Sequence, residues 1–548
     1  MFNGDNMARI AALIVIIFEI IPLSVTIRKK DKECFKFYTH ISNWLCLLSS
    51  ALLAIFGQAS WVMPIRYLSV CMLVITLVIT VVVLLPMYKT IKLFLGRNLY
   101  YHLICPVLTT LSYIFLEYHV STIWMILPVC VTLMYGFTMI YLNYKDKVDG
   151  PYPFFKINKI GKRMTAIWVV VILSVTAVLS GIVGYKPANK CETKFIFVHG
   201  LAGWGSYDPL YEYYSYWGMA GGDSIMYLNN HGYESYAASV DPTGSAWDRA
   251  CELYAQLYGT RVDYGLEHSE RCNHERYGED YTGRGLIKDF DGCTYILIGH
   301  SFGGATIRLF SEILRNGCPE EIEYTTDGSL SDFFKGGKGD GLVAIVTLAA
   351  PTNGTTAYDL YEDPDFDVDS IYIDEEYLKH SDAVSNASKP PEDGRIDEDH
   401  AAFDMHIDNA LALNDRITTF DDVYYFAIPF DSTYVGDDNR HHPDPDITEN
   451  IFMRNAILMS EYTGSTAGGY EIDESWQAND GLVNTISAGA PIGAPSAEYV
   501  DGESLEKGIW YVMPVIHADH MSAQGGLTRF VSVKPKYLEL VKMLSKLK

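Results

Sequence analysis

Cysteine is sparse in this chain of 548 residues and follows no informative pattern. None of the ten cysteines belongs to a Cys-X-X-Cys pair, which excludes the common cysteine-based metal modules. Five lie in the first 130 residues, and the other five lie between positions 191 and 318. Because the second group is odd in number, it predicts no complete disulfide framework and says little about the cellular compartment.

Basic residues are scarce in the larger, C-terminal part of the chain. Residues 191–548 carry 24 Lys and Arg against 60 Asp and Glu, a net charge of −36, whereas residues 1–190 carry a net charge of +11. Nucleic-acid binding rests on Lys and Arg that neutralise phosphates, so the acidic part argues against a nucleic-acid partner. The total length is sufficient for two or three domains.

Long apolar runs are confined to the first third of the chain. Six of them approach or exceed the roughly 18–20 residues that a helix needs to cross a bilayer. A cleaved signal peptide is disfavoured because further runs follow the first. The pattern predicts a six-helix transmembrane domain at 1–185, a linker at 186–193 and a second domain at 194–548. The six runs lie near residues 8–27, 41–61, 68–88, 100–118, 121–142 and 165–184.

The loops between these runs alternate in basic charge. Lys and Arg are concentrated in loops 28–40, 89–99 and 143–164, whereas loop 62–67 has one Arg and turn 118–121 has none. The positive-inside rule places the three basic loops in the cytoplasm and both termini outside. We therefore expect a multi-pass protein of the cell membrane whose second domain is extracytoplasmic.

A few polar residues interrupt the predicted spans. Thr39, in Phe-Tyr-Thr-His-Ile-Ser-Asn, begins the second span, and His102, in Tyr-Tyr-His-Leu-Ile-Cys-Pro, begins the fourth. These motifs resemble those of six-helix membrane proteins that include the androgen-induced hydrolases of fatty-acid esters. The resemblance implies an intramembrane site in which Thr39 and His102 act together. We favour the alternative, in which the polar groups bond neighbouring helices and His102 lies at the wet interface.

Residues 295–304, Tyr-Ile-Leu-Ile-Gly-His-Ser-Phe-Gly-Gly, form the most informative motif. An apolar run precedes Gly-X-Ser-X-Gly, and a helix-competent segment follows at 305–316. In this context the serine is typically a nucleophile, because a tight turn flanked by glycines exposes its hydroxyl. The motif predicts Ser301 as nucleophile and the N–H of Phe302 as an oxyanion-hole donor. The alternative is an ordinary glycine-rich turn.

Short apolar runs recur through the second domain, with helix-competent segments between several of them. Alternating strands and helices predict an α/β domain with a mainly parallel sheet that helices cover on both faces. The first run ends in His-Gly-Leu-Ala-Gly-Trp-Gly, where a serine hydrolase draws its second oxyanion donor. We assign this donor to the N–H of Leu201; the alternative is a flexible loop. The five runs are Lys194–Val198, Tyr295–Ile298, Leu342–Leu348, Val423–Ile428 and Ile509–Met513.

A serine nucleophile needs a base and a carboxylate that orients the base. In α/β hydrolases both follow the serine, in the order Asp or Glu and then His. Asp480 lies in Asn-Asp-Gly-Leu-Val, and His517 and His520 lie in Val-Ile-His-Ala-Asp-His-Met-Ser. Order alone admits Asp480 with His520, but His517 and Asp519 compete with them.

Longer motifs are more specific than the serine turn. Through them, residues 194–530 resemble the large zinc-containing lipases of Bacillus-type thermophiles and staphylococci, which belong to the α/β-hydrolase superfamily. The resemblance implies a lipase or carboxylesterase that forms an acyl-enzyme, with Ser301 as nucleophile, Asp480 as orienting carboxylate and His520 as base. The matching motifs lie at 199–205, 247–257, 262–265 and 479–485.

The same resemblance implies one zinc ion held by two Asp and two His. Asp248, in Trp-Asp-Arg-Ala-Cys, matches the first ligand, and His268 and His274 match the histidines. The fourth ligand is expected in a later insertion, where Asp-Phe-Asp-Val-Asp selects Asp369. Such a set is closed and tetrahedral, hence structural. Without the resemblance the histidines are solvated loop residues, and Cys272 between them is a stray candidate ligand.

Two features of that family are missing. Its calcium site uses an acidic residue two positions after the catalytic His and an Asp soon after, but here Ser522 and then Gly-Gly-Leu at 525–527 follow. We therefore expect no calcium site. The segment of the family's lid, around Tyr361–Asp404, is short and acidic and has no clear apolar face, which does not favour interfacial activation.

Three functions compete on this basis. The first is a membrane-tethered, extracytoplasmic serine ester hydrolase whose partners are lipid esters and membrane lipids. The second is a membrane sensor or adhesion protein with an inert, hydrolase-shaped domain; the presence of every triad element argues against it. The third makes the membrane domain a second enzyme or a lipid-handling module that feeds the hydrolase.

Overall fold

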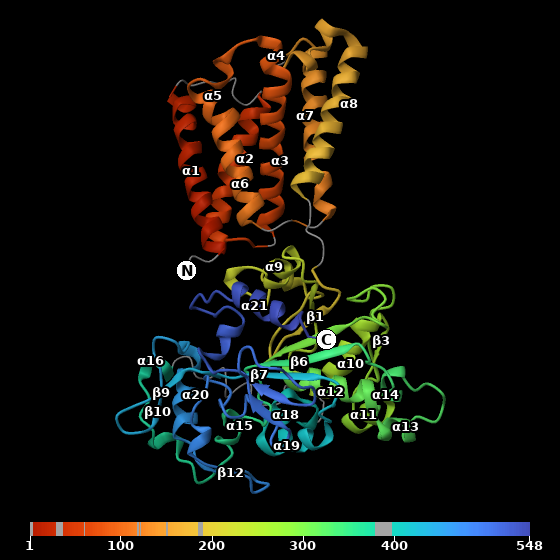
Figure 1. Cartoon of the computed structure of the whole chain (residues 1–548), viewed down its shortest axis with the longest axis vertical. Helices are drawn as coiled ribbons and strands as arrows, with labels where there is room; N and C mark the ends of the chain where they lie inside the picture. Colours follow the sequence, from red (N-terminus) through yellow and green to blue (C-terminus); the bar gives the residue numbers. More distant parts are fainter. Residues whose placement is uncertain are drawn as a thin grey trace. The chain divides into compact units, whose positions relative to one another are not determined.

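The computed structural model divides into two compact units, residues 1–188 with 220–230 and residues 189–219 with 231–548. Residues 29–36 of the first basic loop and 186–189 of the predicted linker lie outside the described residues. The structure describes residues 4–28, 37–59, 61–117, 120, 122–149, 152–184, 190–378 and 397–547 (Figure 1).

The N-terminal unit consists of helices. In its described part, five segments are long and apolar enough to cross a membrane, and they indicate membrane association: Ala8–Arg28, Tyr38–Phe56, Val62–Tyr88, Trp124–Tyr144 and Ile157–Val183. The main helices are α1 (Gly4–Arg28), α2 (Tyr38–Phe56), α3 (Val62–Ile79), α4 (Leu85–Tyr88), α5 (Arg97–Leu99), α6 (Cys105–Leu116), α7 (Leu127–Tyr144), α8 (Ile157–Val183) and α9 (Ser224–Asn230).

The predicted fourth span, at 100–118, is not among these five segments. Its residues lie on a π-helical turn at Tyr100–Ile104, directly after α5, and on α6. The third segment also contains a π-helical turn, at Thr80–Leu84 between α3 and α4. Six transmembrane spans therefore remain a prediction, of which five have a matching helix.

The second unit is built on a seven-stranded sheet, drawn in yellow through green to blue in Figure 1. The strand order is β13–β14–β7–β6–β5–β1–β2, and every neighbouring pair is parallel. All five predicted runs lie on these strands, whereas β2 and β13 are too short and too polar to show as apolar runs. The strands are β1 (Lys194–Val198), β2 (Ser235–Ala238), β5 (Tyr295–His300), β6 (Leu342–Leu348), β7 (Tyr424–Ile428), β13 (Ser496–Glu498) and β14 (Trp510–Val512).

Helices and short two-stranded pairs accompany this sheet. The helices are α10 (Ala246–Tyr258), α11 (Leu266–Cys272), α12 (Gly303–Asn316), α13 (Pro319–Tyr324), α14 (Asp332–Lys335), α15 (Thr356–Asp359), α16 (Glu375–Leu378), α18 (Ala401–Met405), α19 (Ile407–Arg416), α20 (Asn450–Glu461) and α21 (Lys534–Leu544). The two-stranded pairs are β3 (Arg261–Asp263) with β4 (Tyr277–Asp280), β8 (Phe430–Asp431) with β15 (Ile516–His517), β9 (Thr433–Val435) with β10 (His441–Pro443), and β11 (Gly464–Ser465) with β12 (Glu471–Ile472).

Alternate side chains of β1 pack in opposite directions, as the two-residue period of a strand requires. Ile196 and Val198 belong to the buried core that also contains residues of α10 and α12. Phe197 points the other way and packs edge-on against Tyr537 of α21, with ring centroids 5.6 Å apart. Helices therefore cover both faces of the sheet, and the prediction of a parallel α/β domain is confirmed.

Candidate functional site

Ser301 lies at the turn between β5 and α12, where the serine motif places it. Its φ angle of 53° is in the left-handed region. Its backbone N–H donates to the carbonyl oxygen of Leu348 on β6 at 2.9 Å. A non-glycine residue in this region is strained by about 1–2 kcal/mol. Strand β5 on one side and helix α12 on the other hold this strained turn, and Ser301 lines a cavity.

The glycines around Ser301 are required by close backbone contacts. A Cβ on Gly299 would lie 2.5 Å from the carbonyl carbon of Gly303, and one on Gly303 would lie 2.3 Å from the carbonyl oxygen of Val198. A Cβ on Gly200, in the loop after β1, would lie 2.6 Å from the Ser301 Cβ. The loop that carries Leu201 therefore runs directly against the serine turn.

His520 and Asp480 form a buried pair. The His520 Nδ1 atom lies 2.8 Å from the Asp480 Oδ2 atom. The backbone N–H of His520 also donates to the backbone carbonyl oxygen of Asp480 at 2.9 Å. The other carboxylate oxygen, Oδ1, accepts the N–H groups of Leu482 and Val483 at 3.0 and 2.8 Å. Both carboxylate oxygens of Asp480 therefore have hydrogen-bond partners, and the carboxylate holds the His520 ring through its Nδ1 atom.

The competing residues have other surroundings. The His517 side chain is 52% exposed and lies 3.5 Å from the carboxylate of Asp444. The Asp519 carboxylate accepts hydrogen bonds from the backbone of Glu449 and from Ser522. Of the alternatives that sequence order leaves open, the geometry favours His520 with Asp480.

Ser301 and His520 line one cavity of about 270 Å³. In the described part of the chain, the N–H groups of Leu201 and Phe302 have no hydrogen-bond acceptor. A mostly apolar cavity with a few convergent polar groups is typical of a small-molecule site. Its apolar lining includes Leu201, Met219, Tyr358, Met405, Phe452 and Leu527.

A chain of hydrogen bonds joins the loop after β1 to His520. The Gly200 N–H donates to the Tyr216 hydroxyl oxygen at 3.0 Å, and this hydroxyl lies 2.6 Å from the His300 Nδ1 atom. The His300 Nε2 atom lies 3.2 Å from the His520 carbonyl oxygen. Burial lowers the pKa of His300 well below its usual value, so the ring is neutral and donates from Nε2 while accepting at Nδ1.

Sequence reasoning missed Tyr216 and His300. His300 is only the variable residue of Gly-X-Ser-X-Gly, and Tyr216 lies in a tyrosine-rich segment that no spacing distinguishes. Arg249 was also missed. Its buried guanidinium donates to the carbonyl oxygens of His199 and Asp241, contacts that no local motif indicates. All three residues position the loop that carries Leu201.

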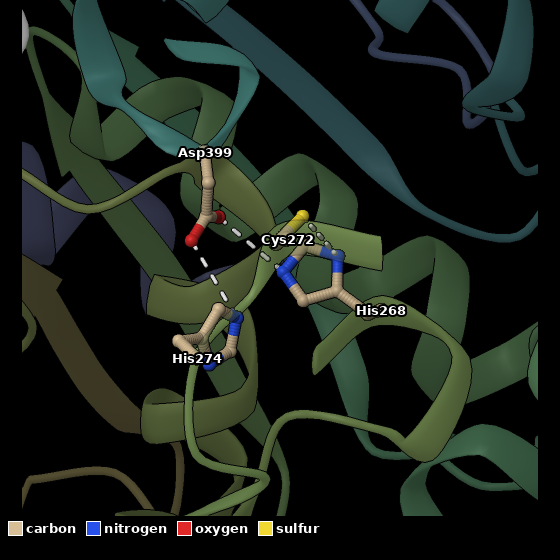
Figure 2. Close-up of side chains that lie close together, drawn as sticks. All are labelled: His268, Cys272, His274 and Asp399. Carbon is tan, nitrogen blue, oxygen red and sulfur yellow. Dashed lines mark hydrogen bonds and ion pairs between the residues drawn. The ribbon is translucent and has the colours of Figure 1, made fainter. Parts of the chain in front are cut away.

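A second cluster combines histidines and carboxylates from three elements; Figure 2 shows its His268, His274 and Asp399 together with the neighbouring Cys272. Asp248 lies on α10, His268 on α11, His274 just beyond α11, and Asp399 on a 3₁₀ turn at 397–399. The His268 Nε2 atom lies 3.2 Å from Asp248 Oδ1 and 3.3 Å from Asp399 Oδ1. The His274 Nε2 atom lies 3.5 Å from Asp399 Oδ2 and 3.9 Å from Asp248 Oδ1.

These four side chains fit a tetrahedral metal ion. Ligand atoms about 2.0–2.2 Å from a tetrahedral zinc are about 3.3–3.6 Å apart, close to the distances between these atoms. The buried Nε2 atoms of His268 and His274 make no hydrogen bond among the described residues. Burial, together with the charge of Asp399, raises the pKa of Asp248, so a cation at this point would stabilise both carboxylates.

The fourth expected ligand, Asp369, does not join this cluster and is corrected to Asp399. Asp369 lies exposed on the 3₁₀ turn Val368–Ser370. The Ser245 hydroxyl donates to Asp399 Oδ1 at 2.7 Å, which ties this carboxylate to the start of α10. Cys272 lies on the other side of the imidazole, with Sγ 3.8 Å from His268 Nδ1 rather than at Nε2 (Figure 2).

The N-terminal candidates Thr39 and His102 make separate contacts. The Thr39 hydroxyl lies 3.1 Å from the Tyr152 hydroxyl, and the His102 Nδ1 atom lies 2.7 Å from the Leu93 carbonyl oxygen. Within the described residues no hydrogen bond joins Thr39 to His102. These contacts agree with the structural interpretation of both residues, and an intramembrane site remains a prediction.

The described part of the expected lid region contains no long helix. In the described part of Tyr361–Asp404, the regular elements are short 3₁₀ turns, α16 and the first residues of α18. Residues 379–396 of this segment lie outside the described residues.

Comparison with known sequences identifies relatives of the second unit. Residues 191–385 and 374–543 match the family model described as "Lipase-like, C-terminal domain". The chain is 33% identical to Lipase 2 of Staphylococcus aureus over 380 residues, which cover 65% of this chain and 53% of that protein. It is 33% identical to a lipase of Staphylococcus hyicus over 359 residues, covering 61% and 54%. The chain thus spans about half the length of these relatives.

Solved structures agree with this result. The crystal structure of Staphylococcus hyicus lipase superposes with a TM-score of 0.55 at 29% identity, over 66% of this chain and 98% of that one. EstA from Clostridium botulinum superposes with a TM-score of 0.56 at 31% identity, over 67% and 90%. With the parallel sheet described above, these neighbours identify the second unit as an α/β-hydrolase domain. Since the family match extends over residues 191–543, the chain belongs to the lipase-like family.

Proposed function

We propose that this chain is a membrane-tethered serine ester hydrolase, a lipase or carboxylesterase, that cleaves lipid esters through an acyl-enzyme. One observation carries the proposal. Ser301 and His520 line the same apolar cavity, and the Asp480 carboxylate lies 2.8 Å behind the His520 imidazole. The similarity to staphylococcal lipases supports the same reaction class.

Acylation begins when the Ser301 Oγ atom attacks the ester carbonyl carbon. His520 Nε2 accepts the serine proton, and Asp480 keeps the imidazole in the tautomer that carries its proton on Nδ1. The oxyanion of the tetrahedral intermediate accepts hydrogen bonds from the N–H groups of Leu201 and Phe302. Collapse of the intermediate expels the alcohol, which takes the proton from His520 and leaves the acyl group on Ser301.

Deacylation repeats these steps with water. His520 removes a proton from a water molecule, whose oxygen attacks the acyl carbon, and then returns the proton to Ser301 Oγ as the fatty acid leaves. The two N–H groups stabilise the second oxyanion as they do the first. An oxyanion donor of this kind contributes about 10²–10³-fold to turnover in a related class of enzyme.

The substrate class follows from the cavity wall. Leu201, Met405 and Phe452 present apolar surface beside the serine, which suits an acyl chain better than a polar or charged group. The net charge of the second domain is strongly negative, which disfavours polyanionic substrates. Lipid esters and simple carboxylic esters fit both constraints.

We propose one zinc ion, held by Asp248, His268, His274 and Asp399, in a structural role. When bound, zinc supplies a closed, four-coordinate link between α10, α11 and the 3₁₀ turn at 397–399. None of the four residues lines the cavity that contains Ser301. The catalytic steps above therefore use only side chains and backbone N–H groups of the chain.

Activity-based labelling tests the catalytic proposal. Membranes that contain the full-length chain are treated with a fluorescent fluorophosphonate, which reacts with an activated serine. The wild-type chain should be labelled and should hydrolyse short-chain nitrophenyl esters, whereas Ser301→Ala should do neither. A wild-type chain that folds but neither reacts nor hydrolyses any ester would support the inert membrane sensor instead.

A further inference from the structure

Glu449, at the residue just before α20, is buried and holds a distant loop. Its Oε1 atom accepts the backbone N–H groups of Leu527, Thr528 and Arg529 at 2.9, 2.8 and 2.9 Å. Its Oε2 atom accepts the Thr528 hydroxyl. Three consecutive N–H groups that converge on one oxygen form an anion-binding nest, which here is filled by a side chain of the same chain.

The backbone of Glu449 also bonds Asp519, the residue that directly precedes His520. The Glu449 backbone N–H donates to Asp519 Oδ2 at 2.9 Å. Asp519 Oδ1 in turn accepts the N–H and the hydroxyl of Ser522 at 3.0 and 2.7 Å. Two carboxylates therefore fasten the segment at 519–529 to the start of α20, and His520 lies inside this segment.

A calcium ion does not fit at this place. Calcium binds six to eight oxygen atoms. Here the loop at 527–529 turns N–H donors, not oxygens, toward Glu449, and its sequence offers no carboxylate between His520 and Phe530. Hydrogen atoms that point at the site repel a cation and attract an anion.

The charge of Glu449 suits this arrangement. Burial alone would raise its pKa, but the hydrogen bonds from the Thr528 hydroxyl and from the backbone at 527–529 outweigh burial and lower the pKa. The carboxylate is thus ionised at neutral pH. Charge-assisted hydrogen bonds of this type are stronger than those of a neutral amide, so a carboxamide is a poor replacement.

We propose that Glu449 is a metal-independent positioning residue for the proposed hydrolase: its carboxylate fixes the loop after His520, and with it the cavity wall. The inference rests on the proposed function, because Met521, Gln524 and Leu527 of this loop line the cavity with Ser301. Glu449 touches no reacting atom. It acts by holding His520 and the loop in the geometry that ester hydrolysis requires.

The test is chemical rescue in the full-length chain, solubilised in detergent. Glu449→Ala empties the nest but keeps its three N–H donors. We expect kcat for a short-chain ester to fall at least ten-fold, and we expect added sodium formate, an anion small enough for the vacated space, to restore activity several-fold. Formamide, which is neutral and of similar size, should restore nothing. Glu461→Ala, at the far end of α20, is the matched control and should behave as wild type in both respects.

Further arms keep the outcome decisive. Glu449→Gln keeps the side-chain size and is used if the Ala variant does not fold; full activity in either variant would overturn the proposal. Rescue by formamide as well as formate would indicate mere space filling and would also overturn it. A wild-type chain that loses activity in a calcium chelator and regains it with calcium contradicts metal independence. A wild-type chain without ester hydrolysis or fluorophosphonate labelling instead refutes the proposed function itself.

Discussion

The hydroxyl of Tyr216 lies 2.6 Å from the Nδ1 atom of His300 and also accepts the N–H of Gly200 at 3.0 Å. This single oxygen connects the loop that carries Leu201 with the residue before the proposed nucleophile. It therefore couples the two sources of the proposed oxyanion hole.

Tyr216→Phe should reveal this coupling. Loss of the hydroxyl leaves the buried Gly200 N–H without an acceptor, at a cost of about 1–3 kcal/mol, and leaves the His300 Nδ1 atom with the Gln524 Nε2 atom at 3.4 Å. We expect lower thermal stability and a fall in kcat with little change in KM. Tyr434→Phe, at an exposed position, is the control. Unchanged kcat in a Tyr216→Phe variant would show that the loop keeps its place without the hydroxyl.

The proposed triad predicts a graded set of kinetic defects. His520→Ala and Asp480→Asn should each lower kcat by roughly 10³-fold or more, as in other serine hydrolases in which one triad member is removed. His517→Ala should have a much smaller effect because its side chain is exposed and pairs elsewhere. Steady-state assays on a simple ester measure all three. The opposite ranking of His517 and His520 would show that the assignment of the base is wrong.

The metal cluster predicts about one zinc per chain, measured by elemental analysis of the purified protein. His274→Ala and Asp399→Asn should lower the bound zinc and the melting temperature more than the turnover at moderate temperature, because a closed site links segments and leaves no open coordination position. Asp369→Asn should change neither quantity. Zinc that persists in Asp399→Asn but is lost in Asp369→Asn would contradict the geometry.

Two buried histidines predict a loss of stability in mild acid. Burial lowers the pKa of His300 well below its usual value and that of His199 to about 3. Below pH ~6.5 the unfolded chain gains a proton at each histidine and the folded chain does not, so the unfolding free energy decreases by about 1.4 kcal/mol per pH unit for each group. The stabilisation is thus complete above pH ~6.5 and is lost as the pH falls.

Denaturant titrations of the full-length chain at pH 7.5, 6.0 and 5.0 measure this effect. In His300→Gln the slope below pH ~6.5 should be shallower by the share of one histidine. Val500→Ala, at an exposed position without a titratable group, is the control and should leave the slope unchanged. An unchanged slope in His300→Gln would show that this ring is protonated in the folded state.

The orientation of the hydrolase unit is a further prediction. The basic loops at 28–40 and 143–164 should stay in the cytoplasm, since short basic loops resist translocation. The proposed active site would then lie outside, where a short tether raises the effective concentration of lipid esters of the outer leaflet. Protease added to intact cells should release a fragment that still reacts with fluorophosphonate. If the fragment is released only after cell lysis, the hydrolase unit lies in the cytoplasm and the predicted topology is wrong.

Local features of this protein follow from sequence alone. The glycines beside Ser301 report a turn in which no Cβ fits, and the apolar runs report strands buried on both faces or helices long enough for a bilayer. Each signal comes from residues that are neighbours along the chain, so a short motif or an apolar run of sufficient length is enough to detect it. The charge pattern likewise separates the two units, because the acidic residues are concentrated after position 190.

Sequence alone does not decide which of several chemically similar side chains belongs to a site, because that depends on contacts between segments that are distant along the chain. Sequence offers several acidic residues in the stretch that supplies the fourth metal ligand and selects Asp369, whereas Asp399 reaches the histidines through its bond to Ser245. Tyr216 and Glu449 carry no local signal at all. The sequence determined the elements and the residue types of the site; only tertiary packing decided which buried polar group meets which partner, since each such group must find a hydrogen bond or an opposite charge wherever the folded chain brings one within reach.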